Sequence, residues 1–189
     1  MKKPLATLGT LVLAVGLATG LSAAAPPPAA ASGPYNEPYC GITWGSLTKS
    51  AGTYSGAQIT NARAGRHSCY DRMVIDLRGK VSGFDVRYAS VYREGSGQYV
   101  PLSGAGDIRI VVRSAAYTSW GSPTYTPASW ANAVNVRGFD TFRQVSYAGS
   151  FEGQTTFGLG VRARLPMRAF ILDGPGTGSR LVVDVAHQW

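Results

Sequence analysis

The segment RAGRHSCYDRMVIDLRG, residues 63–79, decides the fold class of this chain. Alternate side chains of a β-strand point to opposite faces. Met73 and Leu77, with the isoleucine between them, then form an apolar face, whereas Arg72 and Asp76 lie on the other face. This alternation predicts a strand that is buried on one side and polar on the other.

Seven further segments are short, rich in β-branched or aromatic residues, and mostly separated by Gly, Pro, Asp or Ser. They are residues 57–64, 84–91, 107–114, 143–149, 155–163, 168–172 and 180–186. We expect no amphipathic helix of about twelve or more residues, because no apolar pattern of helical period extends that far. Many short strands in a chain with 24 glycines predict an all-β sandwich or barrel.

The motif RMVIDL, which begins at Arg72, is echoed by RLVVDV, which begins at Arg180. In both, the arginine is followed four positions later by an aspartate, Asp76 or Asp184. Either the two strands occupy equivalent places in the two halves of a sandwich, or a short β pattern recurs by chance. For the two aspartates we expect structural ion pairing with Arg72 or Arg180. A ligand-binding role and a catalytic carboxylate pair, as in glycoside hydrolysis, are the alternatives.

The N-terminus has the organisation of a secretory signal peptide. Two lysines precede an apolar run at residues 5–21, and small residues follow it. Thr and Gly interrupt the run, so we expect no permanent membrane anchor. We predict a signal peptide at 1–31, an extended arm rich in Gly, Pro and Ser at 32–55, and a folded domain at 56–189. The protein is then secreted, and is either extracellular or associated with the cell wall.

Cys40 and Cys69 are the two cysteines of the chain. An even number in an exported protein favours a disulfide. Closing a loop of about thirty residues stabilises the fold by roughly 3–4 kcal/mol in the chain-entropy model. The stretch RHSCYDR loosely resembles the active-site signature of L,D-transpeptidases, but Ser68 replaces its glycine and the upstream histidine is missing. We therefore expect a disulfide and no reactive thiol.

The formal net charge is +8, and most of the cations are arginines. A basic exported protein is attracted to anionic wall polymers, whose phosphates and carboxylates arginine binds at two points. General solubility combined with an arginine-rich coding bias is the alternative explanation. We expect no nucleic-acid partner, because the arginines are scattered along the chain and the protein is exported.

Motifs for catalysis are missing from the sequence. There is no nucleophile elbow and no phosphate-binding glycine loop. The two histidines, His67 and His187, have no spacing typical of a zinc site. We expect His187 to lie beside Asp184 near the end of the last strand. The sequence therefore predicts a protein that is not an enzyme and that holds no metal or cofactor.

Residues 115–132, AAYTSWGSPTYTPASWAN, form an expected long loop that is rich in aromatic side chains. Long structured loops in compact domains are often functional. Aromatic faces with a polar edge also suit sugar rings. The alternative is that these side chains close one open end of the core. The loop carries Tyr117, Trp120, Tyr125 and Trp130.

Four segments resemble AMIN-like domains, relatives of the amidase N-terminal (AMIN) domain of secreted bacterial envelope proteins. They are YCGITWGSL (39–47), ITNARAGRHSCYDRMVIDL (59–77), GSFEGQTTFGLGVR (149–162) and FILDGPGTGSRLVVDVAH (170–187). The resemblance implies an antiparallel β-sandwich of two small sheets outside the cytoplasm, in the manner of the actinobacterial AMIN-like group. It also implies a non-catalytic domain that docks to the cell wall or to envelope machinery. No amidase domain is expected after it.

We therefore expect a secreted module that binds the cell wall, either peptidoglycan or an anionic wall polymer. The alternative is an exported subunit or inhibitor that binds another envelope protein, and a wall hydrolase is a third hypothesis. The candidate ligand-binding residues are Tyr117, Trp120, Tyr125, Trp130, Arg72, Asp76, Arg180 and Asp184.

Overall fold

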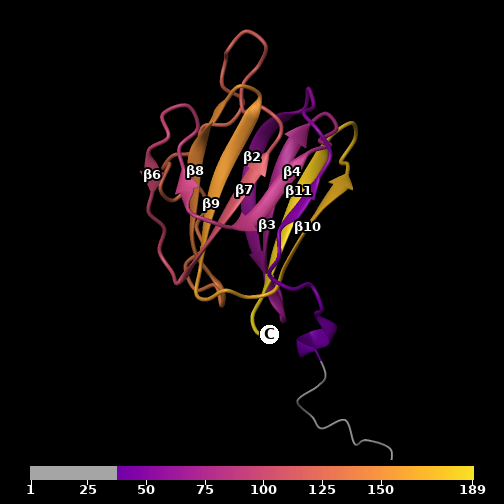
Figure 1. The fold of residues 1–189 in the computed structure, drawn as a ribbon. Coiled ribbons are helices and arrows are strands. Elements are labelled where there is room, and N and C mark those ends of the chain that lie inside the picture. The colour runs from indigo at the N-terminus through magenta and orange to yellow at the C-terminus, as the bar shows by residue number, and fades with distance from the viewer. Residues whose placement is uncertain (1–37) are drawn as a thin grey trace, which may run out of the picture. The chain divides into compact units, whose positions relative to one another are not determined.

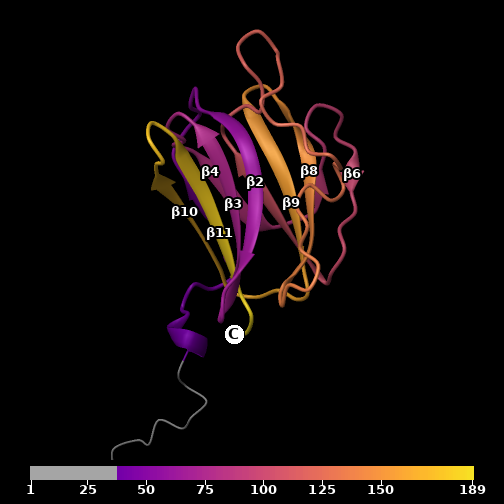
Figure 2. The same ribbon diagram turned by 180° about the vertical axis from the view of Figure 1, so that it is seen from behind.

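The strand pattern produces two main antiparallel sheets that pack face to face (Figures 1 and 2). The structure is a computed structural model that describes residues 38–189, so the expected signal peptide lies outside the described residues. In chain order the elements are the 3-10 helix η1 (Tyr39–Gly41) and the strands β1 (Lys49–Ala51), β2 (Gln58–Arg66), β3 (Tyr70–Arg78), β4 (Phe84–Tyr88), β5 (Val91–Tyr92), β6 (Tyr99–Val100), β7 (Gly106–Val112), β8 (Phe142–Phe151), β9 (Gln154–Val161), β10 (Met167–Asp173) and β11 (Ser179–Ala186).

The five-stranded sheet has the order β1-β4-β7-β9-β8, and the four-stranded sheet has the order β10-β11-β3-β2. The short strands β5 and β6 form a separate pair. Each of the eight segments that the sequence assigns to a strand contributes one, and the all-β sandwich is confirmed. Strand β1 lies in the region assigned to the arm, and it pairs with the edge of β4.

The core lies between the two sheets and is built by alternation along each strand. On β3, Met73 and Ile75 are fully buried, and they belong to the same apolar cluster as Ile108 of β7 and Leu159 of β9. Burial of a side chain of this size stabilises the folded state by about 1.5–3 kcal/mol. The apolar face of each sheet therefore provides most of the energy that holds the two layers together.

The outer face of the five-stranded sheet is partly covered by the chain that follows β6. A Cβ atom added at Gly160 of β9 would lie 2.1 Å from the carbonyl oxygen of Ser103. Only glycine allows this close approach of two backbones. Leu102 packs beside Ser103 against Val91 and Val100, so a small second cluster closes this part of the sheet.

The two echoed motifs lie on adjacent strands of one sheet, β3 and β11. The interpretation that places them in separate halves of a sandwich is therefore wrong. Antiparallel pairing sets Arg72 opposite Asp184 and Asp76 opposite Arg180, around the central pair Val74 and Val182. Both motifs have the aspartate four residues after the arginine. Because the two strands run in opposite directions, this shared spacing places each arginine opposite the aspartate of the other motif.

Cys40 and Cys69 form a disulfide with a Cα–Cα distance of 6.2 Å, as the sequence predicts. It connects the segment around η1 to the residue just before β3. With both cysteines paired, there is no free thiol for a transpeptidase reaction.

A double variant, Cys40→Ser with Cys69→Ser, tests the contribution of this disulfide. We expect the free energy of unfolding to fall by roughly 3–4 kcal/mol, because the unfolded chain regains the freedom of a loop of about thirty residues. Urea unfolding followed by tryptophan fluorescence measures the change. An unchanged unfolding midpoint in the double variant would contradict a stabilising role.

Candidate functional site

The outward side chains of the four-stranded sheet form three rows that run across β10, β11, β3 and β2. This face carries most of the charged residues that the sequence singles out. The first row is Arg168, Asp184, Arg72 and Gly65; the second is Phe170, Val182, Val74 and Arg63; the third is Leu172, Arg180, Asp76 and Asn61.

Asp184 is fully buried although it lies on the outward face. It accepts two hydrogen bonds from Arg72, from Nε at 2.7 Å and from Nη2 at 2.8 Å. Nε of Arg168 donates a third at 2.8 Å. The hydrogen bond with Asp184 raises the pKa of Arg72 above its ordinary value. This is the structural ion pair that the sequence favours for Asp184, with Arg168 as an additional partner.

Aromatic side chains cover this ion cluster. The guanidinium of Arg168 lies 4.3 Å from the ring centre of Trp44 and 5.0 Å from that of Phe170. The guanidinium of Arg72 lies 5.3 Å from the ring centre of Tyr70. Cation–π contacts of this kind strengthen when the groups are removed from water. The rings therefore hold both arginines over Asp184 and exclude water from the carboxylate.

Asp76 is held by a different arginine from the one that faces it. Arg63 of β2 donates to it from Nε at 2.9 Å and from Nη2 at 3.0 Å, and Asn61 donates at 3.1 Å. Both aspartates of the echoed motif are therefore bound to guanidinium groups at two points. This arrangement favours a structural role for them over a catalytic one.

Arg180 is left without a carboxylate partner among the residues that the structure describes. Its Nη2 donates to the carbonyl oxygen of Asp173 at 2.9 Å. Its Nε is buried and has no hydrogen-bond partner. An unsatisfied buried donor is costly, and the charge of this guanidinium is not balanced by a carboxylate of the described residues.

A hollow of about 260 Å³ lies between Arg180, Arg72 and Arg63. Its lining contains four basic or imidazole side chains and no acid: Arg63, Ala64, Gly65, His67, Arg72, Val74, Leu172, Arg180 and Val182. Valine and leucine side chains provide apolar contact area within it. This combination can bind a phosphate or carboxylate that is attached to a body with an apolar face.

The aromatic residues of the 115–132 loop do not form one surface. Tyr125 is buried, and its ring contacts those of Tyr147 and Phe157 at centroid distances of 5.3 and 5.8 Å. Burial raises its pKa to about 12.

Trp130 is 48% exposed and stacks with Arg93, whereas Trp120 is 92% exposed. The hydroxyl of Tyr117 accepts a hydrogen bond from the backbone N–H of Gly153. The loop therefore combines core closure with one fully solvated tryptophan.

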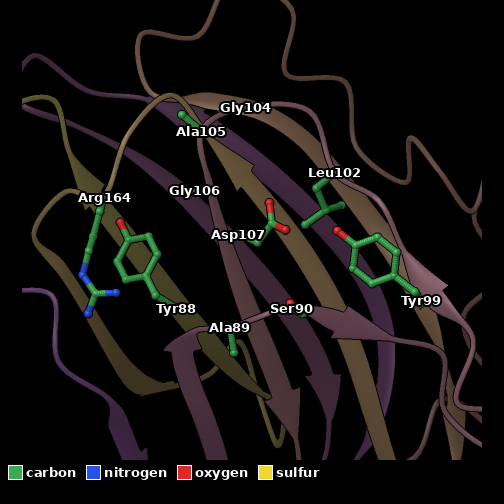
Figure 3. A pocket seen from close by; sticks show the side chains of 10 residues that line it. All are labelled: Tyr88, Ala89, Ser90, Tyr99, Leu102, Gly104, Ala105, Gly106, Asp107 and Arg164. Carbon is green, nitrogen blue, oxygen red and sulfur yellow. The ribbon is translucent and has the colours of Figure 1, made fainter.

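A larger hollow of about 510 Å³ lies on the outer face of the five-stranded sheet, around Asp107 (Figure 3). Figure 3 shows Asp107 between Tyr88 on one side and Leu102 and Tyr99 on the other. Burial raises the pKa of the Asp107 carboxyl. Arg164 stacks on Tyr88 at 4.7 Å and donates to Ser46, and it makes no ion pair with Asp107. The sequence gives no signal for this hollow, because its lining comes from separate segments.

His187 lies beside Asp71 and not beside Asp184, so that expectation is wrong. Its Nε2 is 3.3 Å from Oδ1 of buried Asp71 and 3.8 Å from Oδ2 of Asp140. The other oxygen of Asp71 accepts hydrogen bonds from the backbone N–H groups of Thr141 and Phe142. Metal-ligating atoms of these three side chains lie within 4.8 Å of one another. Asp71, however, already accepts hydrogen bonds from the backbone at the start of β8, which gives it a structural role.

Sequence reasoning misses three residues of the charged face: Arg63, Arg168 and Trp44. Arg63 and Arg168 lie on the strands adjacent in sequence to the echoed motifs, β2 and β10, and Trp44 lies outside the strands; only the cross-strand register and the path of the N-terminal segment bring them onto this face. The short-range pattern around Arg72 and Arg180 carries no information about those neighbours. Among the described residues, no helix is both long enough and apolar enough to cross a membrane.

The two aspartates of the echoed motifs give a matched test of this geometry. We expect Asp184→Ala to lower the free energy of unfolding by about 3 kcal/mol, because it leaves two arginines beneath aromatic rings without a counter-charge. Asp76→Ala removes a partly exposed pair and should cost about 1 kcal/mol or less. Chemical denaturation of both variants measures the difference, and equal losses would contradict the buried-cluster explanation.

Comparison with known proteins places the chain in a family. No match is found among curated proteins or among solved structures. A family model described as AMIN-like domain matches residues 57–187, which span β2 to the end of β11. Because the match covers well over half of the sequence, the chain belongs to the AMIN-like domain family.

Proposed function

We propose that this protein is a non-catalytic cell-envelope module that binds an anionic polymer of the cell wall through the outer face of its four-stranded sheet. The hollow between Arg63, Arg72 and Arg180 carries the proposal, because its lining contains no acid. Arg180 in particular has no carboxylate partner among the described residues, and its Nη2 donates only to a backbone carbonyl.

The cellular setting supports this choice of partner. The AMIN-like domain indicates an envelope context, and the Cys40–Cys69 disulfide indicates a location outside the cytoplasm. Polymers of the envelope carry repeated phosphate or carboxylate groups. A chain with a formal net charge of +8 is drawn to them before any specific contact forms.

The geometry suggests how a polymer would be held. One anionic group would accept hydrogen bonds from Arg180 and from an unused N–H of Arg63 or Arg72. Leu172 and the valines of the second row would contact the less polar face of the adjoining unit. The polymer carries many such anionic groups. When one of them dissociates, a neighbouring group is already present at high local concentration, so the overall affinity rises.

Co-sedimentation with purified wall sacculi tests the proposal. We expect the disulfide-bonded protein to pellet at low salt and to be released as the salt concentration rises, because salt screens exposed charges. Arg180→Gln should weaken binding roughly tenfold or more, since a hydrogen bond to a charged group contributes about 1.5–3 kcal/mol. The bound fraction is measured across a protein titration at each salt concentration.

The matched control is Arg137→Gln. Arg137 is exposed, lies in the loop before β8, and loses the same charge on substitution. An equal loss in the two variants would mean that net charge alone drives association. If the unsubstituted protein stays in the supernatant at low salt, wall binding through this face is wrong.

A second candidate function, docking to another envelope component as an interaction subunit, is favoured by Trp120. Its loop is fixed by hydrogen bonds between Thr118 and both Gly121 and Ser122, yet the indole is 92% exposed. Exposed tryptophans are frequent anchors of protein interfaces, and they also stack on sugars. Pelleting that survives salt but is lost in Trp120→Ala would assign a glycan contact to this loop. A discrete crosslinked partner lost in the same variant would assign a protein contact.

A further inference from the structure

We infer that the outer face of the five-stranded sheet carries a second site, separate from the wall-binding face, which binds a single carboxylate group through Arg109. The two sites belong to different sheets and share no residue in their linings. A test that contradicts the proposed function would therefore leave this inference unaffected, and the reverse also holds.

The pairing of β4 with β7 places Arg109 directly opposite Arg87. Like charges at directly opposed positions of an antiparallel pair are destabilising. Arg87 is compensated by Asp85, whose carboxylate lies 2.6 Å from its Nε. Arg109 has no such partner, so the local charge balance on this face is incomplete.

Arg109 is also without a hydrogen bond from its side chain in the part of the chain that the structure describes. Its Nε is buried and unsatisfied. Its other cross-strand neighbour is Gly158, and the space above that glycine is filled by Leu102 and Val91. Asp107, two residues away on the same face, lines the hollow of Figure 3 and forms no ion pair with Arg109. The strand register therefore gives this guanidinium no acid on either side.

A hollow of about 280 Å³ opens beside Arg109. Three arginines and two acids are among its lining residues, which are Tyr54, Asp85, Arg87, Glu94, Arg109, Val111, Arg113 and Gln154. Glu94 accepts hydrogen bonds from Thr156 at 2.5 Å and from Gln154 at 2.9 Å, so its position is fixed without a cation. With three arginines and two acids, the lining carries a formal net charge of +1.

This charge balance selects the class of ligand. One excess positive charge balances a carboxylate monoanion, whereas a phosphate dianion beside Asp85 and Glu94 would leave an excess of negative charge. A planar guanidinium also binds a carboxylate at two points. The lining is mostly polar, and Val111 is its one aliphatic side chain. The ligand is therefore a small hydrophilic acid, either the free carboxyl end of a short peptide or a sugar acid.

Nuclear magnetic resonance titration of the disulfide-bonded protein tests this site with two pairs of probes. N-acetylalanine and its amide represent the peptide carboxyl end, and glucuronate and glucose represent the sugar acid. We expect saturable shifts of β4 and β7 backbone amides with one or both acids and none with the neutral counterparts. The acid that binds more tightly identifies the source. Inorganic phosphate should bind at least tenfold more weakly than that acid.

Arg109→Gln should weaken binding of the acid at least tenfold, whereas Arg137→Gln, in the exposed loop before β8, should leave it unchanged. Equal binding by Arg109→Gln and the unsubstituted protein would overturn the inference. So would the lack of saturable shifts with both acids, or phosphate binding as tight as carboxylate binding.

A stability measurement separates a binding role from a structural one. Without ligand, Arg109→Gln should leave Tm unchanged or raise it, because the substitution removes a charge that faces Arg87 and an unsatisfied buried donor. Arg87→Gln removes the partner of Asp85 and should lower Tm. A fall of more than about 3 °C in Arg109→Gln would show that Arg109 has a structural partner, and the inference would fail.

Discussion

The pairing of β3 with β11 is the constraint on which the rest of the four-stranded sheet depends. It buries Met73 and Ile75 in the core on one side and sets Arg72 against Asp184 on the other. A fully buried carboxylate is tolerated only with well-placed partners, because desolvation of the charge costs several kcal/mol. Arg72 and Arg168 supply those partners from both neighbouring strands. The polar face is therefore as closely tied to strand register as the apolar core is.

The disulfide extends that constraint to the N-terminal segment. Cys69 stands just before Tyr70, and its carbonyl oxygen accepts a hydrogen bond from the backbone N–H of His187 at 2.9 Å. Cys40 leads within a few residues to Trp44, whose ring covers Arg168. The disulfide thus holds the segment around Cys40, which has little regular structure, against the four-stranded sheet. In that position Trp44 of the same segment covers Arg168 and excludes water from Asp184. The same bond that stabilises the fold also organises the edge of the candidate site.

Local sequence patterns predict the strands well and the site poorly. Composition, turn residues and, in several segments, alternation identify all eight longer strands, whereas β1, β5 and β6 are too short to give such a signal. The Arg-to-Asp spacing in the two echoed motifs points to ion pairs, but the partner of Asp76 proves to be Arg63, from a different strand. In the aromatic loop, composition gives no means of separating buried Tyr125 from exposed Trp120. These contacts depend on strand order and loop path, which short-range patterns do not encode.

The excess of arginine over acid has a structural meaning that composition alone does not show. The chain has 18 basic and 10 acidic residues, so one-to-one pairing leaves cations without a carboxylate partner. If the excess served only solubility, the unpaired arginines would lie in loops and be solvated, as exposed Arg137 is. Arg109 and Arg180 instead lie on sheet faces, where register fixes their backbones, and each has a buried Nε without an acceptor. A buried donor left unsatisfied opposes folding, so these arginines are kept at a cost to the fold. Neither guanidinium has a carboxylate partner among the described residues, so an anion from outside the chain would balance a charge that the fold leaves unbalanced.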